Sequence, residues 1–481
     1  MNYKSRIAAL ATIALLFLLH LLFLHADPDY FLSFSRDAFT DEGLNTSQVR
    51  NYINHGYLDL NECDDMIKSP LFNLLLYLPL KIFGTHLIVA RITVLLCLLI
   101  SLLVICRHDY FSQMIPLLFA TTLIQYYVFQ YSHFSLSEMI AVSSIFFGVF
   151  FLFRFFHEQK RYQLFLSALF LSVTYYLKIQ FVYIIVLLPA SFIMNWITGI
   201  VAINHIKRLS QGIFWLLLFA GIYFVAWYLP FQHTYHYVMS DQVTGKFAGL
   251  RRIPYTILFN ITYVLFSGQT WWFNSLVAIC FFIGAFVFIR SQDTNFKILF
   301  MLGCLWMFIE LHKISMLYLP SRYLVSYYFA AGLMCSVVLR QMLLFKIQHR
   351  ILRRIAVALL TLFFIGNSIY YGLLLGRRSY HIQEVNDYFA STLKNTNQPV
   401  MGVWGANTTW DCRARTIPVW RDFMNDKDII NRFHPQAIVS EPDEAESNQA
   451  YSAQGIKLQE IADSSRAFEV GKWKVIVYWV K

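Results

Sequence analysis

The first residues that could carry chemistry are the adjacent carboxylates Asp41 and Glu42, a short distance after the first long apolar segment. A carboxylate held at a membrane surface can act as a general base and take the proton from an attacking hydroxyl group. An arbitrary acidic pair in a loop is more often simply solvated, because Asp and Glu are mostly exposed in proteins. The assignment therefore depends on what the rest of the chain places near this pair.

Three further features favour a site around the acidic pair. Glu138 lies at the start of an apolar segment, where a carboxylate is costly and tends to be functional, although it could also reach water at the interface. Lys68 precedes Pro70, which suits the first turn of a helix, so an anion could dock there. The third feature is a set of basic residues in the same set of loops, each of which alone would more often anchor a lipid phosphate. These are Lys178, Lys246, Arg251, Arg252, Lys313 and Arg322.

The composition indicates whether these residues belong to a soluble protein or to a membrane protein. The chain has 481 residues, of which 57% are apolar, 18% aromatic and only 14% charged. Apolar runs of roughly 20 residues, the length that crosses a hydrocarbon core, recur along most of it. The formal net charge of +11 does not indicate nucleic acid, because the Lys and Arg residues lie mainly in short loops between apolar runs. The chain is therefore an integral membrane protein.

The apolar runs predict an all-α polytopic membrane protein with about eleven transmembrane helices. The predicted spans are residues 7–25, 86–106, 113–131, 137–156, 163–177, 179–197, 213–230, 271–289, 296–312, 322–339 and 355–375. An odd number of crossings places the two termini on opposite sides of the membrane.

Basic residues assign the two sides. If the N-terminus is cytoplasmic, every loop on that side is basic, as the positive-inside rule requires. The other side then receives the loop 26–85, the loop 231–270 and the tail 376–481. We expect a multi-pass protein of the cell inner (plasma) membrane, with its C-terminal domain periplasmic or extracellular and its function on that face.

Two domains are predicted. Residues 1–375 form the transmembrane catalytic domain, in which the outer loop 26–85 carries interfacial helices, one of them at 71–83. The tail 376–481 loses the membrane composition and is expected to form a small extracytoplasmic α/β domain. Its predicted elements are strands at 399–404, 437–440 and 474–480 and a helix near 382–394.

The order of these motifs resembles the GT-C class of glycosyltransferases, over roughly residues 1–375. It is most similar to the bacterial branch that contains the lipid A aminoarabinose transferase and the protein O-mannosyltransferase relatives. The matching motifs, in chain order, are Asp41-Glu42-Gly43, Lys68-Ser69-Pro70-Leu71, Phe83-Gly84, Ala90-Arg91, Ser137-Glu138-Met139 and Arg322-Tyr323-Leu324. Ser69 stands where the family usually has proline, and Gly43-Leu44-Asn45 lacks the Arg-Tyr often found after the acidic pair.

The resemblance implies roles for individual residues. Asp41 matches the catalytic carboxylate with Glu42 as its neighbour, and Glu138 matches the second acidic position. Lys68 and Arg322 match basic residues of the family, and we expect them to bind the donor phosphate together with Arg251 and Arg252. The implied donor is a polyprenyl-phosphate sugar, and the acceptor is a lipid or a protein. Asp41 would deprotonate the acceptor hydroxyl as it attacks the anomeric carbon, with inversion there.

Other interpretations stay open at this point. A secondary transporter would also need many spans and buried charges, but it predicts paired repeats and broken spans near the midplane, and no clear repeat is present. An envelope scaffold that uses its tail to bind a partner is a third possibility. No residue spacing demands a metal, so a divalent cation on the phosphate is left open. Cys63 and Cys412 could form a disulfide only if two distant loops meet.

Overall fold

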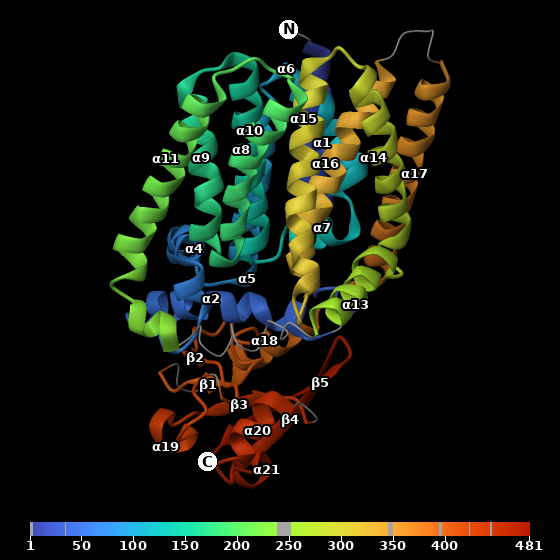
Figure 1. Ribbon diagram of the computed structural model, residues 1–481. Helices are drawn as coiled ribbons and strands as arrows, with labels where there is room; N and C mark the ends of the chain where they lie inside the picture. The colour runs from blue at the N-terminus through green and yellow to red at the C-terminus, as the bar shows by residue number, and fades with distance from the viewer. Residues whose placement is uncertain are drawn as a thin grey trace.

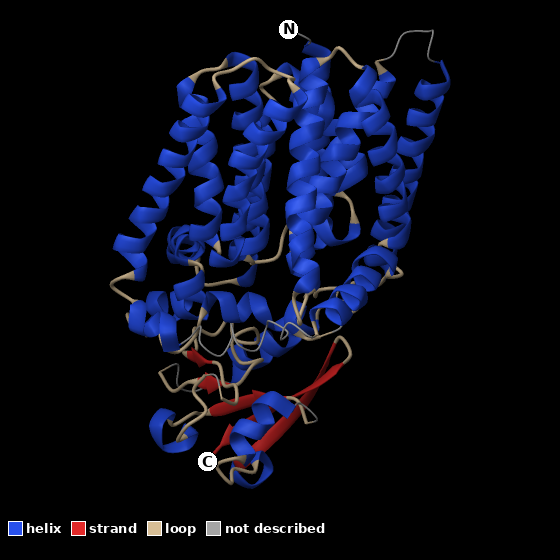
Figure 2. Ribbon diagram, in the orientation of Figure 1, coloured by secondary structure: helices blue, strands red, loops and turns tan. Residues whose placement is uncertain are grey.

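The computed structural model describes residues 3–33, 35–237, 252–344, 350–393, 397–422, 424–442 and 445–481. Long helices form a bundle, and a small domain that contains the sheet lies beyond one end of it (Figures 1 and 2). The N-terminus lies at the opposite end (Figure 1). The predicted architecture, a polytopic helical bundle with a small C-terminal sheet domain, is therefore confirmed.

Nine helices in the described part of the chain are long and apolar enough to cross a membrane. Short 3-10 or π turns extend several of them. They are α1 (Tyr3–Leu21), α5 (Leu87–Ile105), α8 (Ser137–Glu158), η2 with α10 (Ile179–Val186, Leu187–Thr198), α11 with η3 (His205–Tyr223, Phe224–Tyr228), α14 (Trp271–Arg290), α15 with η4 (Thr294–Glu310, Leu311–Ser315), η5 with α16 (Ser321–Leu324, Val325–Leu343), and α17 (Arg350–Gly376).

The other two predicted spans differ from this pattern. Residues 163–177 fall in α9 (Arg161–Leu177), a helix of 17 residues that lies between α8 and α11. Residues 113–131 are divided among α6 (Asp109–Leu118), the π turn η1 (Phe119–Leu123) and α7 (Tyr126–Tyr131). The helix breaks because the side chain of Gln125 accepts hydrogen bonds from the backbone N–H groups of Tyr127 and Val128 and so starts α7 separately.

Among the described residues, further helices gather at the end of the bundle next to the tail. They include α2 (Asp37–His55), α3 (Asp65–Lys68), α4 (Pro70–Phe83) and α13 (Ile253–Phe266). α2 and α13 lie between the bundle and the sheet domain (Figure 1). α4 is largely apolar but too short to span, and it buries Phe72 and Leu76 while Leu74 and Leu78 stay exposed. The loop 26–85 thus supplies helices near the interface, as the sequence predicts.

The described residues of the tail fold around a mixed sheet of five strands, in the order β2-β1-β3-β5-β4. β1 runs parallel to β2 and β3, and β5 runs antiparallel to β3 and β4. The tail's elements are α18 (His381–Thr392), β1 (Val400–Met401), β2 (Thr416–Ile417), α19 (Ile429–Phe433), β3 (Ala437–Ser440), α20 (Ala445–Ser452), α21 (Leu458–Ile461), β4 (Ala462–Val470) and β5 (Trp473–Val480). The sequence predicted β1, β3, β5 and α18 but not β2 or β4.

Candidate active site

α2 presents two carboxylates to one basic residue. Asp37 and Asp41 are four residues apart, so they lie on the same face of the helix. Arg322 enters from η5, and its Nη1 pairs with both carboxylates, at 2.8 Å from Oδ2 of Asp41. The side chain of Asp41 is 14% exposed, so this carboxylate is not completely enclosed by the protein.

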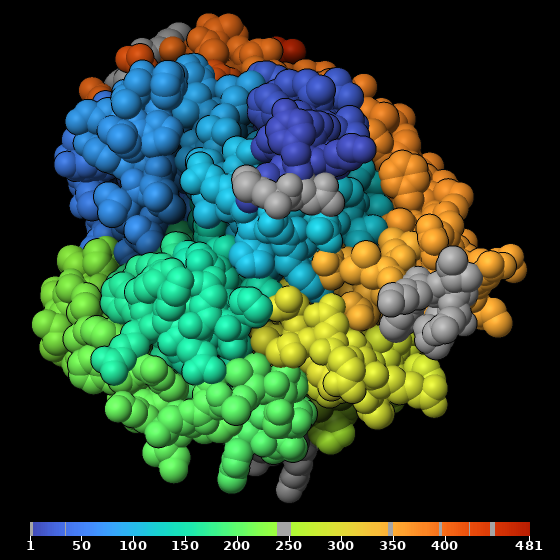
Figure 3. Space-filling view, turned by 90° about the horizontal axis from the view of Figure 1, so that it is seen from above, coloured from blue at the N-terminus to red at the C-terminus, as the bar shows by residue number. Residues whose placement is uncertain are grey.

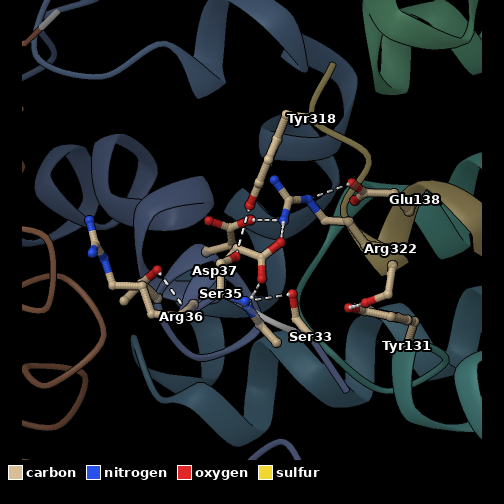
Figure 4. A network of polar contacts seen from close by, with 12 residues as sticks. Ser33, Ser35, Arg36, Asp37, Tyr131, Glu138, Tyr318 and Arg322 are labelled. Carbon is tan, nitrogen blue, oxygen red and sulfur yellow. Dashed lines mark hydrogen bonds and ion pairs between the residues drawn. The ribbon is translucent and has the colours of Figure 1, made fainter. Parts of the chain in front are cut away.

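Glu138 and Lys178 extend this ion-pair cluster. Glu138, in the first turn of α8, is fully buried, and its Oε1 lies 2.5 Å from Nζ of Lys178 and 3.4 Å from Nε of Arg322. Figure 4 shows the guanidinium group of Arg322 between Asp37 and Glu138. Arg322 thus lies among three carboxylates, with its Nε facing Glu138.

Hydroxyl groups border the cluster. The hydroxyl of Tyr318 lies 2.8 Å from that of Ser35, and the hydroxyl of Tyr131 lies 2.8 Å from that of Ser321, which precedes Arg322 (Figure 4). Such rings and hydroxyls suit a ligand with both polar and apolar faces. The site thus combines carboxylates, fixed cations and hydroxyls at the tail-facing end of the bundle.

The surroundings of Asp41 make it a better base than an exposed aspartate. Burial raises the pKa of Asp41 to about 6, although the positive charge of Arg322 opposes the shift. A base is most effective when its pKa lies near the working pH. At neutral pH Asp41 would therefore be mostly ionised and still basic enough to accept a proton.

Asp65 adds a carboxylate that the sequence did not single out. Burial raises its pKa to about 7, and it lies within electrostatic reach of Asp41, Glu138 and Lys178. Its Oδ2 accepts a hydrogen bond of 2.9 Å from Nδ2 of Asn73 on α4. The beginning of α3 therefore borders the cluster.

Glu42 points away from its neighbour Asp41. Its carboxylate is fully buried and accepts two hydrogen bonds from Arg91 on α5, at 2.9 and 2.5 Å, and one of 2.7 Å from the backbone N–H of Ser135. Arg91 also donates to backbone carbonyl groups that follow α1. Glu42 therefore joins α2 to the bundle, and the structure does not bring it into the cluster around Asp41.

Glu42→Gln is expected to lower the free energy of unfolding by about 3–5 kcal/mol, because it leaves the charge of Arg91 buried without a counter-charge. Chemical unfolding of the purified protein in detergent micelles measures this loss. Replacing both Glu42 and Arg91 by Met should cost less, since no lone charge then remains in the interior. Wild-type stability for Glu42→Gln would contradict the anchoring role.

Gly43, the next residue, contacts the tail. A Cβ atom built there would overlap the backbone of Ala406 and Asn407, so only glycine permits this close approach. Asn407 donates a hydrogen bond to the carbonyl of Phe39, and Arg50 donates to the carbonyls of Gly43 and Ala406. Asp41 thus faces the site, Glu42 faces the bundle and Gly43 faces the tail. Through these contacts α2 is held between the two domains.

The remaining predicted phosphate ligands are placed differently. Lys68 is buried at the end of α3 and pairs with Asp64, one turn before it. Arg252 is exposed at the start of α13. Arg251 and Lys246 lie outside the described residues. The structure thus brings Arg322 and Glu138 to Asp41, and it adds Asp37 and Asp65.

One sequence signal could have found Asp37. It precedes Asp41 by four residues, so a helix that covers both positions puts both side chains on the same face. The contact between Lys178 and Glu138 depends on how α8 and α9 pack, which sequence spacing does not reveal. In the part of the chain that the structure describes, no group of three or more His, Cys, Asp or Glu residues is arranged to hold a metal ion, and Cys63 and Cys412 are free thiols.

Comparison with solved structures identifies the fold. ArnT from Cupriavidus metallidurans bound to undecaprenyl phosphate superposes with a TM-score of 0.62 at 13% identity, over 97% of each chain. The apo state of the same protein gives a TM-score of 0.64 at 12% identity, again over 97% of each chain. The archaeal oligosaccharyltransferase AglB from Archaeoglobus fulgidus, in complex with an inhibitory peptide and a dolichol-phosphate, gives 0.52 at 10% identity over 92% of this chain and 70% of its own.

Comparisons by sequence give no match: no protein-family model and no curated protein matches the chain. At identities of 10–13% the structural likeness shows the fold and not the substrate. It does cover nearly the whole chain, tail included, and both neighbours are GT-C proteins. The chain therefore has the GT-C fold.

Proposed function

We propose that the protein is a membrane glycosyltransferase that moves a sugar from a polyprenyl-phosphate donor to a hydroxyl group of a lipid or protein acceptor. The observation that carries this proposal is the contact of Arg322 with Asp41, Asp37 and Glu138 at the tail-facing end of the bundle. It is supported by the likeness to ArnT bound to undecaprenyl phosphate and to AglB with a dolichol-phosphate. A transporter is expected to hold its buried charges near the midplane of the bundle, whereas this cluster lies at the tail-facing end (Figure 1).

The proposed reaction needs one base. The acceptor oxygen attacks the anomeric carbon, the bond from that carbon to the phosphate oxygen breaks, and Asp41 receives the acceptor's proton. The polyprenyl phosphate leaves with the electron pair of the broken bond, and attack from the opposite side inverts the anomeric carbon. A phosphate is stable as an anion, so no strong general acid is needed. Asp41 is proposed as the catalytic residue, and a positioned base contributes about 10²–10⁴-fold.

Arg322 and Lys178 are proposed to stabilise the departing phosphate. The guanidinium group of Arg322 is fixed by its ion pairs with Asp41 and Glu138, and Nζ of Lys178 is held 2.5 Å from Oε1 of Glu138. Fixed donors of this kind act on charge as it develops, without reorganising at the moment of reaction. Glu138 keeps both cations in place.

Lys68, Arg251 and Arg252 remain proposed contacts for the donor phosphate. Lys68 shares the short helix α3 with Asp65, which lies within electrostatic reach of Asp41. Arg252 precedes α13, a helix at the same end of the molecule (Figure 1). Glu42 is proposed as a positioning residue through its pair with Arg91.

The proposed side of the membrane follows from the basic residues. Arg6 contacts the carbonyl of Arg107 at the N-terminal end of the bundle, and the start of α9 and the end of α14 supply further basic residues. On the positive-inside rule we propose that this end is cytoplasmic and that Asp41 and the tail lie outside. We propose residues 1–375 as the catalytic domain and 376–481 as the domain that holds α2 in position.

The raised pKa of Asp41 predicts a pH dependence. Asp41 must be deprotonated to act as base, so kcat/KM should rise with pH, with a midpoint near 6, and fall about tenfold for each pH unit below it. Initial rates in proteoliposomes between pH 4.5 and 8.5, with an ionophore to collapse any proton gradient, measure this profile. A rate that stays constant from pH 5 to pH 8 would contradict the assignment of Asp41 as the base.

The acceptor can be identified in cells. Mass spectrometry compares the surface glycolipids and glycoproteins of cells with and without the protein. The proposal predicts that one sugar is missing from one acceptor class without the protein and that the matching polyprenyl-phosphate sugar accumulates. Identical acceptor profiles together with an unchanged donor pool would contradict it.

A further inference from the structure

A surface groove runs along the packed helices α9 and α11 near the N-terminal end of the bundle, away from the tail. It has a volume of about 540 Å³, within the range of about 300–1,000 Å³ typical of small-ligand sites. Its lining residues come from the first two turns of α9 and the second and third turns of α11, and they include Arg161, Phe165, Ser210, Gln211, Phe214 and Trp215. Figure 3 looks onto this end of the molecule.

The groove changes from polar to apolar along the helix axes. Arg161 opens α9, and Phe165 lies one turn further along, about 6 Å deeper into the bundle. On α11, Ser210 and Gln211 likewise precede Phe214 and Trp215 by one turn. This polarity matches a phospholipid, whose head group lies at the interface and whose acyl chains extend inward.

The apolar part of the groove opens toward lipid. Phe165 and Trp215 pack edge to face at 4.9 Å between ring centroids and form a wall between the two helices. Phe214 is 57% exposed, and Leu217 on the same helix is 67% exposed. α11 is one of the candidate spans, so these exposed side chains would face acyl chains.

Arg161 differs from its basic neighbours. Glu158 pairs with Arg154 at 2.8 Å and with Lys160 at 2.9 Å. Among the described residues, no carboxylate pairs with Arg161. Arg208, one turn into α11, contacts the side-chain oxygen of Gln211 at 3.0 Å and adds a second positive charge beside the groove. The polar end of the groove is therefore cationic.

We propose that this groove binds an anionic phospholipid, with its phosphate on Arg161 and one acyl chain along Phe165, Phe214 and Trp215. A phosphodiester head group is the anion that a membrane offers at this depth, and guanidinium groups bind phosphate through paired donors. The site is separate from the Asp41 cluster, at the other end of the bundle, and does not depend on the proposed transfer reaction.

Native mass spectrometry of the full-length protein in detergent tests this site with phosphatidylglycerol and with phosphatidylcholine of the same acyl chains. Phosphatidylglycerol should bind more tightly, and Arg161→Gln should weaken its binding about fivefold. Arg290→Gln is the matched control, because it removes one exposed positive charge at the same end but outside the groove. Ser210→Phe fills the groove without changing charge and should also reduce binding.

Three outcomes would overturn the proposal. Arg161→Gln and Arg290→Gln would weaken binding equally if only the overall surface charge matters. Equal binding of the two lipids would show that the groove does not select the anionic head group. Displacement of phosphatidylglycerol by millimolar inorganic phosphate would assign the cationic end to free phosphate instead. The unfolding temperature of each variant verifies that it is folded, and Ser210→Phe provides a test independent of the Arg161 variant.

Discussion

Asp41→Asn is expected to lower kcat about 10²–10⁴-fold, the contribution typical of a positioned general base. The amide has nearly the same shape as the carboxylate and keeps an oxygen that can accept a hydrogen bond from Arg322, but it cannot take a proton. KM should change little, since the substitution affects the chemical step more than binding. Initial rates of sugar transfer in proteoliposomes, normalised to folded protein, measure the effect.

Asp109→Asn is the matched control for this prediction. Asp109 forms a partly exposed ion pair with Arg6 at the opposite end of the bundle. The same change of charge and shape there should leave kcat within about twofold, because exposed ion pairs contribute little. Activity of Asp41→Asn equal to that of Asp109→Asn would remove Asp41 from the mechanism.

Arg322→Gln is expected to lower kcat about 10²–10³-fold, the loss typical when one preorganised donor to a developing anion is removed. It should also weaken the binding of polyprenyl phosphate, the released product. A second effect acts through Asp41: loss of the adjacent positive charge raises the pKa of this carboxyl further, so the midpoint of the pH profile should move upward from about 6. This shift is a signature that misfolding would not produce.

Arg322→Lys should recover only part of the rate. Lysine keeps the charge but lacks the planar set of donors that contacts Asp37, Asp41 and Glu138 together. Arg353→Gln, an exposed position at the start of α17, is the control for loss of one positive charge. Unchanged affinity for polyprenyl phosphate and an unchanged pH midpoint in Arg322→Gln would contradict the role given to Arg322.

The helical bundle could be predicted because the length of each apolar run directly encodes a span. The same topology placed Asp41, Glu138 and Arg322 on one side, and in the structure they lie together. Their roles remain predictions that the substitutions above test. The resemblance to the GT-C class is confirmed at the level of the fold.

Other features depend on packing that no local pattern records. Glu42 and Asp41 are neighbours in sequence, yet successive residues of a helix point about 100° apart, so only one of them faces Arg322. Strand β4 escaped prediction because its residues 463–467 are exposed and lack an apolar alternation. The break between η1 and α7 depends on the side-chain cap of Gln125, and an average of hydropathy over many residues does not detect such a cap.

In the most direct test, the reconstituted protein is given polyprenyl-phosphate sugars and acceptors. Both are extracted from membranes of the cells that make the protein. The amount of polyprenyl phosphate released is then measured. The proposed function predicts that wild-type protein releases one polyprenyl phosphate for each sugar transferred. Asp41→Asn should release at least about 100-fold less while remaining folded. Equal release by the two proteins, or no release by wild-type protein from any lipid-linked sugar in the extract, would contradict the account.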